Sequence, residues 1–195
     1  YPCGTDRPLT SNVNFVATQV VPNAVLSGVG AGGRVCIFTS ATTNLVVDLN
    51  GWLPKGAGFS TTGPTRVADT RPPSQQPASP AGGTLEVPVA GRFGVPADAA
   101  ALSLNVTAVG PGAAGFLTVY PCGQTRPNAS SLNYAAGQTV PNAVISKVGT
   151  GGAICVFSQQ TTNVIVVLFG WFAQPPSFTS LTPTRIADTR SGEPV

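Results

Sequence analysis

The sequence predicts an all-β protein built from small β-sandwich or β-barrel modules. Glycine and proline, 23 and 19 residues among 195, interrupt nearly every stretch, so helices of ordinary length have no room to form. Short apolar runs alternate with turn residues, as they do in sandwiches and barrels. The hydrophobic fraction of 42% supplies enough apolar material for one or two compact cores.

Seven strands are expected in the best-defined part of the chain. The clearest one, 100–109, places leucine, valine and alanine on one face and serine, asparagine and threonine on the other. Pro88 and Pro141 lie within two extended runs, and we expect their strands at sheet edges or bulges because proline lacks the N–H that a central strand needs. The expected strands are 84–90, 100–109, 116–120, 132–135, 143–148, 153–157 and 164–169.

An internal repeat of 119 residues runs through the chain. Tyr1-Pro-Cys-Gly recurs as Tyr120-Pro-Cys-Gly, and Trp52 recurs as Trp171, with no insertion or deletion between them. This similarity predicts one structural unit that is used repeatedly. The expected division is a trailing half-module at 1–53, a linker at 54–63, a complete module at 64–172, a second linker at 173–182 and the start of a further module at 183–195.

Residues 1–53 hold only the second half of such a unit and therefore need partner strands. A half-sandwich would expose its apolar face and its unpaired strand edges, which favours aggregation. One interpretation is that the sequence is a window on a longer array, in which another part of the array completes the half-module. The other is that an identical subunit supplies the strands in trans, as in donor-strand polymers. The first interpretation is favoured because 183–195 reads as a truncated copy.

Each repeat carries two cysteines with the same spacing of 33 residues. The pairs are Cys3 with Cys36 and Cys122 with Cys155. The even count and the absence of histidine favour one disulfide per module over a metal site. Such bonds predict an oxidising compartment, hence secretion or display on a cell surface. The alternative is four buried free thiols in a cytosolic protein. This alternative explains less well why the same cysteine pair occurs in both copies.

The composition argues against several classes of function. Without histidine, Ser–His and Cys–His nucleophile systems and histidine-ligated zinc sites are excluded. The complete module has only Asp69, Glu86 and Asp98 as carboxylates, and they are well separated in sequence. A net charge of +3 is too weak for a nucleic-acid surface, and the apolar runs are too short to span a bilayer. We therefore expect no enzymatic activity, no metal and no cofactor.

Charged residues gather in two copies of the motif Pro-Thr-Arg-(Val/Ile)-Ala-Asp-Thr-Arg. One interpretation is a ligand site in which arginine forks receive a carboxylate or a sugar hydroxyl. The favoured interpretation is a brace between modules, because the motif stands at a module boundary and its aspartate can pair with its arginines locally. The residues are Arg66, Asp69 and Arg71 in the first copy and Arg185, Asp188 and Arg190 in the second.

The last strand of the module differs between the two copies on one face. Asp48 and Asn50 in the first copy become Val167 and Phe169 in the second, next to Ile165. Leaving such side chains in water would forgo roughly 1.5–3 kcal/mol each. We expect the face formed by Ile165, Val167 and Phe169 to be a partner interface, covered by an adjoining unit or another chain. The alternative is burial within its own domain by a rearranged loop.

A Gly-Trp pair closes each copy, at Trp52 and at Trp171. A tryptophan on a β surface can stack on a sugar ring, as in carbohydrate-binding modules. It can equally be the last residue of the core. Because each unit has one tryptophan and no neighbouring exposed aromatic residues, a core role is favoured.

Five segments together carry a family resemblance. They are PTRVADTR at 64–71, GVPADAAALSLNVTA at 94–108, GFLTVYPCG at 115–123, QTVPN at 138–142 and GWF at 170–172. The set resembles the tandem β modules of secreted actinobacterial proteins. This resemblance implies all-β modules in series in an extracellular, wall-associated or fibre-forming setting, and it implies no catalytic residue. Val167 and Phe169 depart from the pattern, where polar residues are expected.

These observations predict a non-enzymatic structural or surface protein outside the cell, such as a segment of a filament or of a cell-surface fibre. The expected partners are neighbouring repeats of the same chain or identical subunits. The competing interpretation is a module that binds cell-wall or plant glycans through Trp52, Trp171 and the arginine motif.

Overall fold

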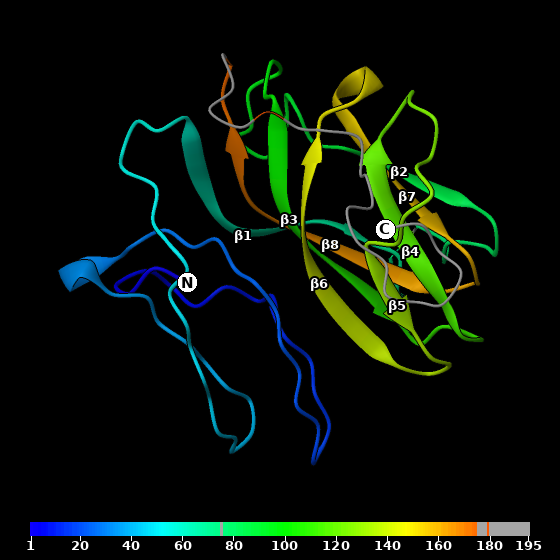
Figure 1. The fold of residues 1–195 in the computed structure, drawn as a ribbon, viewed down its shortest axis with the longest axis horizontal. Helices are drawn as coiled ribbons and strands as arrows, with labels where there is room; N and C mark the ends of the chain where they lie inside the picture. Colours follow the sequence, from blue (N-terminus) through cyan, green and yellow to red (C-terminus); the bar gives the residue numbers. More distant parts are fainter. Residues whose placement is uncertain (75, 175–178, 180–195) are drawn as a thin grey trace, which may run out of the picture.

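Eight β-strands form two four-stranded antiparallel sheets that face one another as a sandwich (Figure 1). The structure, a computed structural model, describes residues 1–74, 76–174 and 179. One sheet has the strand order β1-β8-β3-β6, and the other has the order β2-β7-β4-β5. The all-β prediction is confirmed. Of the two predicted architectures, sandwich and barrel, the structure has the sandwich of two sheets.

The strands and turns have the following bounds. The first sheet contains β1 (Phe59–Asp69), β8 (Asn163–Phe172), β3 (Ala101–Val109) and β6 (Thr139–Lys147). The second sheet contains β2 (Thr84–Pro88), β7 (Ala153–Ser158), β4 (Gly115–Pro121) and β5 (Leu132–Tyr134). Two short 3-10 turns, η1 (Ala31–Gly33) and η2 (Thr150–Gly152), occupy equivalent places in the repeat.

The core lies between the two sheets and is built from the apolar faces of their strands. Leu104 and Val106 of β3, Leu117 of β4, Ile154 of β7 and Leu168 of β8 are all fully buried. Alternate residues of a strand point to opposite faces, so these side chains meet from both layers. Burial of this apolar surface is the main force that holds the sandwich together.

Most of the predicted strands are confirmed, and the prolines lie where their chemistry requires. Pro88 ends β2 and Pro141 lies inside β6, and both strands are sheet edges. The strand missed by the sequence analysis is β1, which begins at Phe59 inside the stretch expected to be a linker. Its sequence is polar and interrupted by Gly63 and Pro64, and a register shift at that point accommodates them. Only the pairing with β8 makes this segment a strand.

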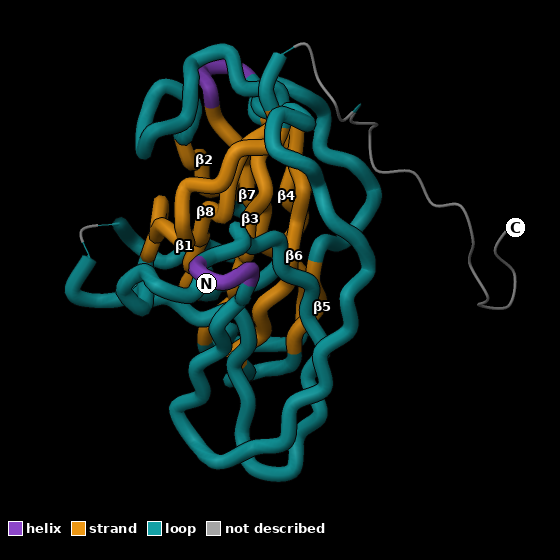
Figure 2. The backbone as a smooth tube through the Cα atoms, turned by 90° about the vertical axis from the view of Figure 1, so that its left-hand side faces the viewer, coloured by secondary structure: helices purple, strands orange, loops and turns teal. Residues whose placement is uncertain are grey.

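Residues 1–53 contain no strand of either sheet and do not form a second sandwich in the described part of the chain. They hold η1 and one isolated β-bridge, between Pro2 and Val35. The segment lies beside the sheet β1-β8-β3-β6, and Figure 2 shows it in front of these strands. Many of its apolar side chains are exposed.

The two disulfide loops have the same local geometry. Cys3–Cys36 and Cys122–Cys155 are both formed, with Cα atoms 5.0 Å apart in each pair, as the cysteine spacing predicts. The Pro2–Val35 bridge corresponds to the pairing of Pro121 with Ile154 one repeat later. The first disulfide loop therefore keeps the geometry of the complete copy although the strands around it are absent.

A glycine explains how each loop closes. Gly30 and Gly149 each donate a backbone hydrogen bond of 2.9 Å, to the carbonyl oxygens of Arg34 and Ala153 respectively. A Cβ atom on either glycine would collide with the backbone of the adjacent cysteine, Cys3 or Cys122. The absence of a side chain is what allows the two segments of the loop to approach so closely.

Candidate functional site

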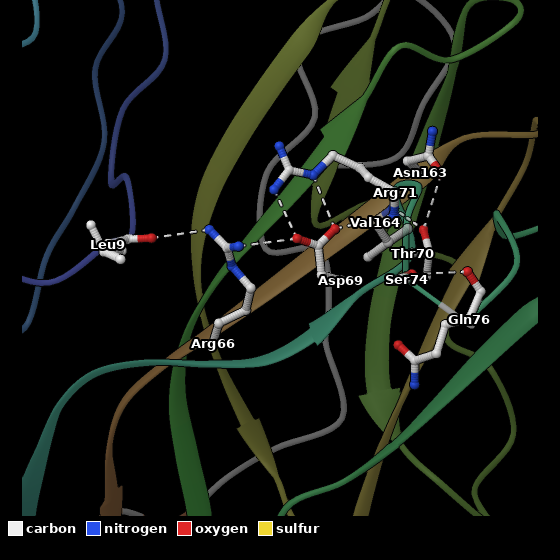
Figure 3. Close-up of polar contacts among 9 residues, drawn as sticks. All are labelled: Leu9, Arg66, Asp69, Thr70, Arg71, Ser74, Gln76, Asn163 and Val164. Atoms are coloured by element: carbon white, nitrogen blue, oxygen red, sulfur yellow. Dashed lines mark hydrogen bonds and ion pairs between the residues drawn. The ribbon is translucent and has the colours of Figure 1, made fainter.

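The arginine and aspartate side chains of the first motif form one cluster at the end of β1 (Figure 3). Arg71 holds Asp69 with two side-chain hydrogen bonds, from Nε to Oδ1 at 3.0 Å and from Nη2 to Oδ2 at 2.8 Å. Arg66 donates from Nη1 to Asp69 Oδ2 at 3.1 Å. The paired arrangement of Arg71 and the carboxylate is the fork geometry that fixes both groups.

The chain around Asp69 is positioned by its pairing with β8. The Thr70 backbone N–H donates to the Val164 carbonyl at 3.0 Å, and the Val164 N–H donates to Thr70 Oγ1 at 2.8 Å. The Arg71 backbone N–H donates to Asp69 Oδ1 at 3.1 Å. The carboxylate thus lies where the chain leaves the sheet, and its bond to the Arg71 N–H holds the backbone of the residues that follow β1.

Electrostatics keep this cluster ionised. The hydrogen bonds from the Arg71 side chain lower the pKa of Asp69 below its ordinary value of 3.8, against the opposing effect of burial. The same bonds raise the pKa of Arg71. Such a pair holds its charges at neutral pH and is poorly suited to move a proton, because a general acid or base needs a pKa near the working pH.

Arg66 also connects this cluster to the N-terminal segment. Its Nη2 atom donates to the Leu9 carbonyl oxygen at 3.1 Å, across 57 residues of sequence. One guanidinium therefore bridges the Asp69 carboxylate and the backbone of the preceding copy. The second copy of the motif, with Arg185, Asp188 and Arg190, lies outside the described residues.

A second and more buried contact joins the N-terminal segment to the same sheet through Asn105 and Asn23. Asn105 is 0% exposed, and its Nδ2 atom donates to the Ser11 carbonyl at 3.1 Å. Asn23 donates from Nδ2 to Asn105 Oδ1 at 2.9 Å, and its own Oδ1 accepts the Ala143 backbone N–H at 2.9 Å. Ala143 belongs to the edge strand β6, so Asn23 caps part of a sheet edge.

This asparagine contact was not predicted from the sequence. The signal was present, because Asn23 and Asn142 occupy equivalent places in the repeat. Asn23 Nδ2 donates to the Asn12 carbonyl, and Asn142 Nδ2 donates to the Ser131 carbonyl, both at 2.6 Å. The shared bond joins the same two positions, 11 residues apart, in each copy. The further bonds of Asn23 to Asn105 and Ala143 come only from tertiary packing.

The apolar face of β8 lies in the same region. Val167 is 2% exposed and Phe169 is 3% exposed, and neither belongs to the main core between the sheets. Ile165 is half-buried. Val167 pairs with Asn105 on one side and with Arg66 on the other, the two residues that bond to the N-terminal segment. The neighbours of Val167 on both adjacent strands thus bond to the N-terminal segment, and the role of this face as a partner interface remains a prediction.

The two tryptophans occupy different environments. Trp171 is half-buried and packs against the core. Trp52 is 78% exposed. Identical positions in the repeat thus have different surroundings, because the first copy lacks the strands that cover Trp171 in the second.

Other features of the described residues concern a pocket, metal binding and membrane helices. An open hollow of about 450 Å³ lies where Tyr1, Pro2 and Asp6 meet Thr62 and Pro64. The described residues contain no group of three histidine, cysteine or acidic side chains placed to hold a metal ion. None of their helices has the length and apolar character needed to cross a membrane. The two disulfides indicate an oxidising environment.

No known protein-family model matches the chain, and no curated protein matches it.

Proposed function

We propose that this chain is a non-enzymatic, extracellular structural repeat protein whose 119-residue β-sandwich modules pack against one another in series. The modules serve as building material of a filament or a cell-surface fibre. Each module contributes a closed core, a disulfide and an Arg/Asp brace at the joint.

The observation that carries this proposal is the joint between the two copies. Residues of the first copy lie on the outer face of the second copy's sheet and bond to it through the half-buried Asn23 and the fully buried Asn105. Arg66 of the brace reaches Leu9 of the first copy. Hydrogen bonds to a buried side chain such as Asn105 fix the relative position of two units better than exposed charges do.

The chemistry of the module supports a structural role. The chain is only 9% charged, so few ions must lose water when surfaces pack together. The Asp69 carboxylate, whose pKa is lowered, is held ionised by two arginines.

Sedimentation velocity and electron microscopy of the purified chain at rising concentrations test the proposal. We expect assemblies that grow with concentration and show an axial step that matches one or two modules. Dispersed monomers at every concentration would contradict the proposed assembly.

A glycan-binding module is the second candidate, favoured by one observation. The indole of Trp52 is exposed, as a sugar-stacking platform requires. Calorimetry with cell-wall and plant glycans distinguishes the two functions. Binding that disappears in Trp52→Ala, and persists in a Phe15→Ala control on the same segment, would favour the glycan function.

A further inference from the structure

We propose that residues 44–53 accept the motif at 183–190 of a second copy of this chain as a neighbouring β-strand. This inference rests on the proposed structural function and specifies one contact by which a copy joins the next. The motif at 183–190 lies outside the described residues, so the structure shows the acceptor side.

The acceptor segment is apolar and unpaired. Among the described residues, no backbone hydrogen bond joins 45–53 to another segment. Val46 is 89% exposed, Val47 is 69% exposed and Leu49 is 85% exposed. Exposed apolar residues on an unpaired segment favour strand addition, because the added strand supplies both hydrogen bonds and apolar cover.

The repeat identifies the strand that fits this acceptor. The equivalent of 44–53 in the complete copy is β8, and four residues of the motif in β1 pair with it. In that ladder Thr65 lies opposite Leu168, Arg66 opposite Val167 and Ala68 opposite Val166. The β1 motif recurs at 183–190. A shift of 119 residues then places Thr184 opposite Leu49, Arg185 opposite Asp48 and Ala187 opposite Val47.

Charge complementarity supports this register. Where Arg66 faces the neutral Val167 in the complete copy, the transferred register places Arg185 opposite Asp48. Asp48 is exposed and has no ion pair among the described residues. Opposite charges that face one another across two strands stabilise the pairing. Asp48, which is a valine in the second copy, thus carries the charge opposite to that of Arg185 in the incoming motif.

The proposed assembly in series favours a second copy as the source of the strand. The acceptor and the donor are different segments of the chain, so a contact between two copies is heterologous. A head-to-tail contact that does not close into a ring repeats indefinitely and generates a filament. Pairing of the motif with 44–53 of its own chain would instead produce a closed monomer.

Cysteine cross-linking between two full-length variants tests the proposal. One variant carries Val47→Cys and the other carries Ala187→Cys. The four natural cysteines are all bound in disulfides, so each variant gains one new thiol. After mixing and mild oxidation, we expect a disulfide between positions 47 and 187, identified by mass spectrometry of the linked peptides.

Val46→Cys mixed with Ala187→Cys is the matched control. Position 46 is the more exposed of the two, so random collisions would favour its cross-link, whereas the proposed register favours position 47. In a second arm, Asp48→Arg is added to the Val47→Cys variant. We expect the yield of the 47–187 link to fall about fivefold, and to recover when the partner also carries Arg185→Asp.

Equal yields at positions 46 and 47 would overturn the proposed register. A link that forms only within a single chain carrying both new cysteines would overturn the assignment to a second copy. If the unmodified chain forms assemblies but the 47–187 link does not form, this inference fails and the structural function stands. If the chain remains monomeric at every concentration, both fail.

Discussion

Asp69 and Asn105 are the two residues whose environments say most about how the copies are joined. Asp69 lies at the surface and is satisfied by two arginines, one of which reaches the first copy. Asn105 is fully buried and satisfies both its amide groups with residues of the first copy. Because buried hydrogen bonds are weakened less by water and salt, we expect Asn105 to contribute more to the joint.

The stability contributed by Asp69 should depend on pH. Its pKa is lowered in the folded state, so its contribution is fully present above the ordinary pKa of 3.8 and is lost as the pH falls through the lower folded value. We expect Asp69→Asn to reduce the free energy of unfolding by about 1 kcal/mol at pH 7, and by progressively less below pH 3.8. Urea unfolding from pH 7 to pH 2 measures the difference.

Asp98→Asn is the control, because Asp98 is exposed and has no ion pair in the described structure. A difference between wild type and Asp69→Asn that stays constant down to pH 2 would show that the charge of Asp69 is not what stabilises the protein.

Removing the side-chain amide of Asn105 should release the first copy from the sheet. Asn105→Ala deletes two hydrogen bonds and leaves the Ser11 carbonyl without its donor, which costs about 1–3 kcal/mol. We expect faster hydrogen exchange at residues 9–25, with protection of β3 and β8 retained. Asn133→Ala, which loses only a local bond to Ser130, should leave exchange at 9–25 unchanged. Unchanged exchange in Asn105→Ala would contradict a joint held by this residue.

At the scale of elements, the disulfide loop is the unit that keeps its form in both copies. The same backbone bonds surround η1 and η2, such as Ala31 N–H to the Cys3 carbonyl at 2.7 Å and Thr150 N–H to the Cys122 carbonyl at 2.8 Å. Arg7 lies over the ring of Phe38 at 3.9 Å, as Arg126 lies over Phe157 at 4.1 Å. These interactions are local, so the loop does not need the missing strands.

The two disulfides should nevertheless stabilise different parts of the molecule. Cys122–Cys155 lies within the sandwich, and its removal as a double alanine variant should lower the free energy of unfolding by about 3–4 kcal/mol through loop entropy. Removal of Cys3–Cys36 should leave the thermal melting of the sandwich nearly unchanged, because residues 1–53 contribute no strand to it. Equal losses in melting temperature would show instead that the two copies unfold as one cooperative unit.

At the scale of the whole molecule, one ordered sandwich carries a segment with many exposed apolar residues. Local stability follows local packing, so this segment should open far more readily than the sheets. Residues 1–53 cover the outer face of the sheet β1-β8-β3-β6 where they bond to it. The residues of this segment that correspond to strands of the second copy belong to neither sheet. The described residues thus combine one ordered sandwich with an N-terminal segment that contributes no strand to it.

Limited trypsin digestion at low protein concentration should reveal this asymmetry. We expect cleavage after the exposed Arg34 before cleavage after Lys147, because Lys147 is paired with Ala101 in the ladder of β3 and β6. The product cut at Arg34 should separate only after reduction, since Cys3–Cys36 spans the cut. Cleavage at the two positions at equal rates would contradict the difference in local stability.

Much of the fold followed from the sequence because the signals are local. Alternation along 100–109, the spacing of the cysteines and the edge positions of Pro88 and Pro141 depend on the period of a strand and on the chemistry of single residues. The candidate site was predictable in part, since the aspartate and arginines of one short motif can meet without distant help.

The tertiary structure decided what depends on distant partners. Phe59–Asp69 has no strand pattern of its own and becomes β1 only against β8. Asn105 looks like an outward polar residue in its strand, yet Asn23 and Ser11 bury it completely. Trp52 and Trp171 share one sequence position and differ in exposure because only the second copy has its neighbouring strands. Period and composition specify which face of a strand is apolar, but what lies against each face is set by segments far away in the chain.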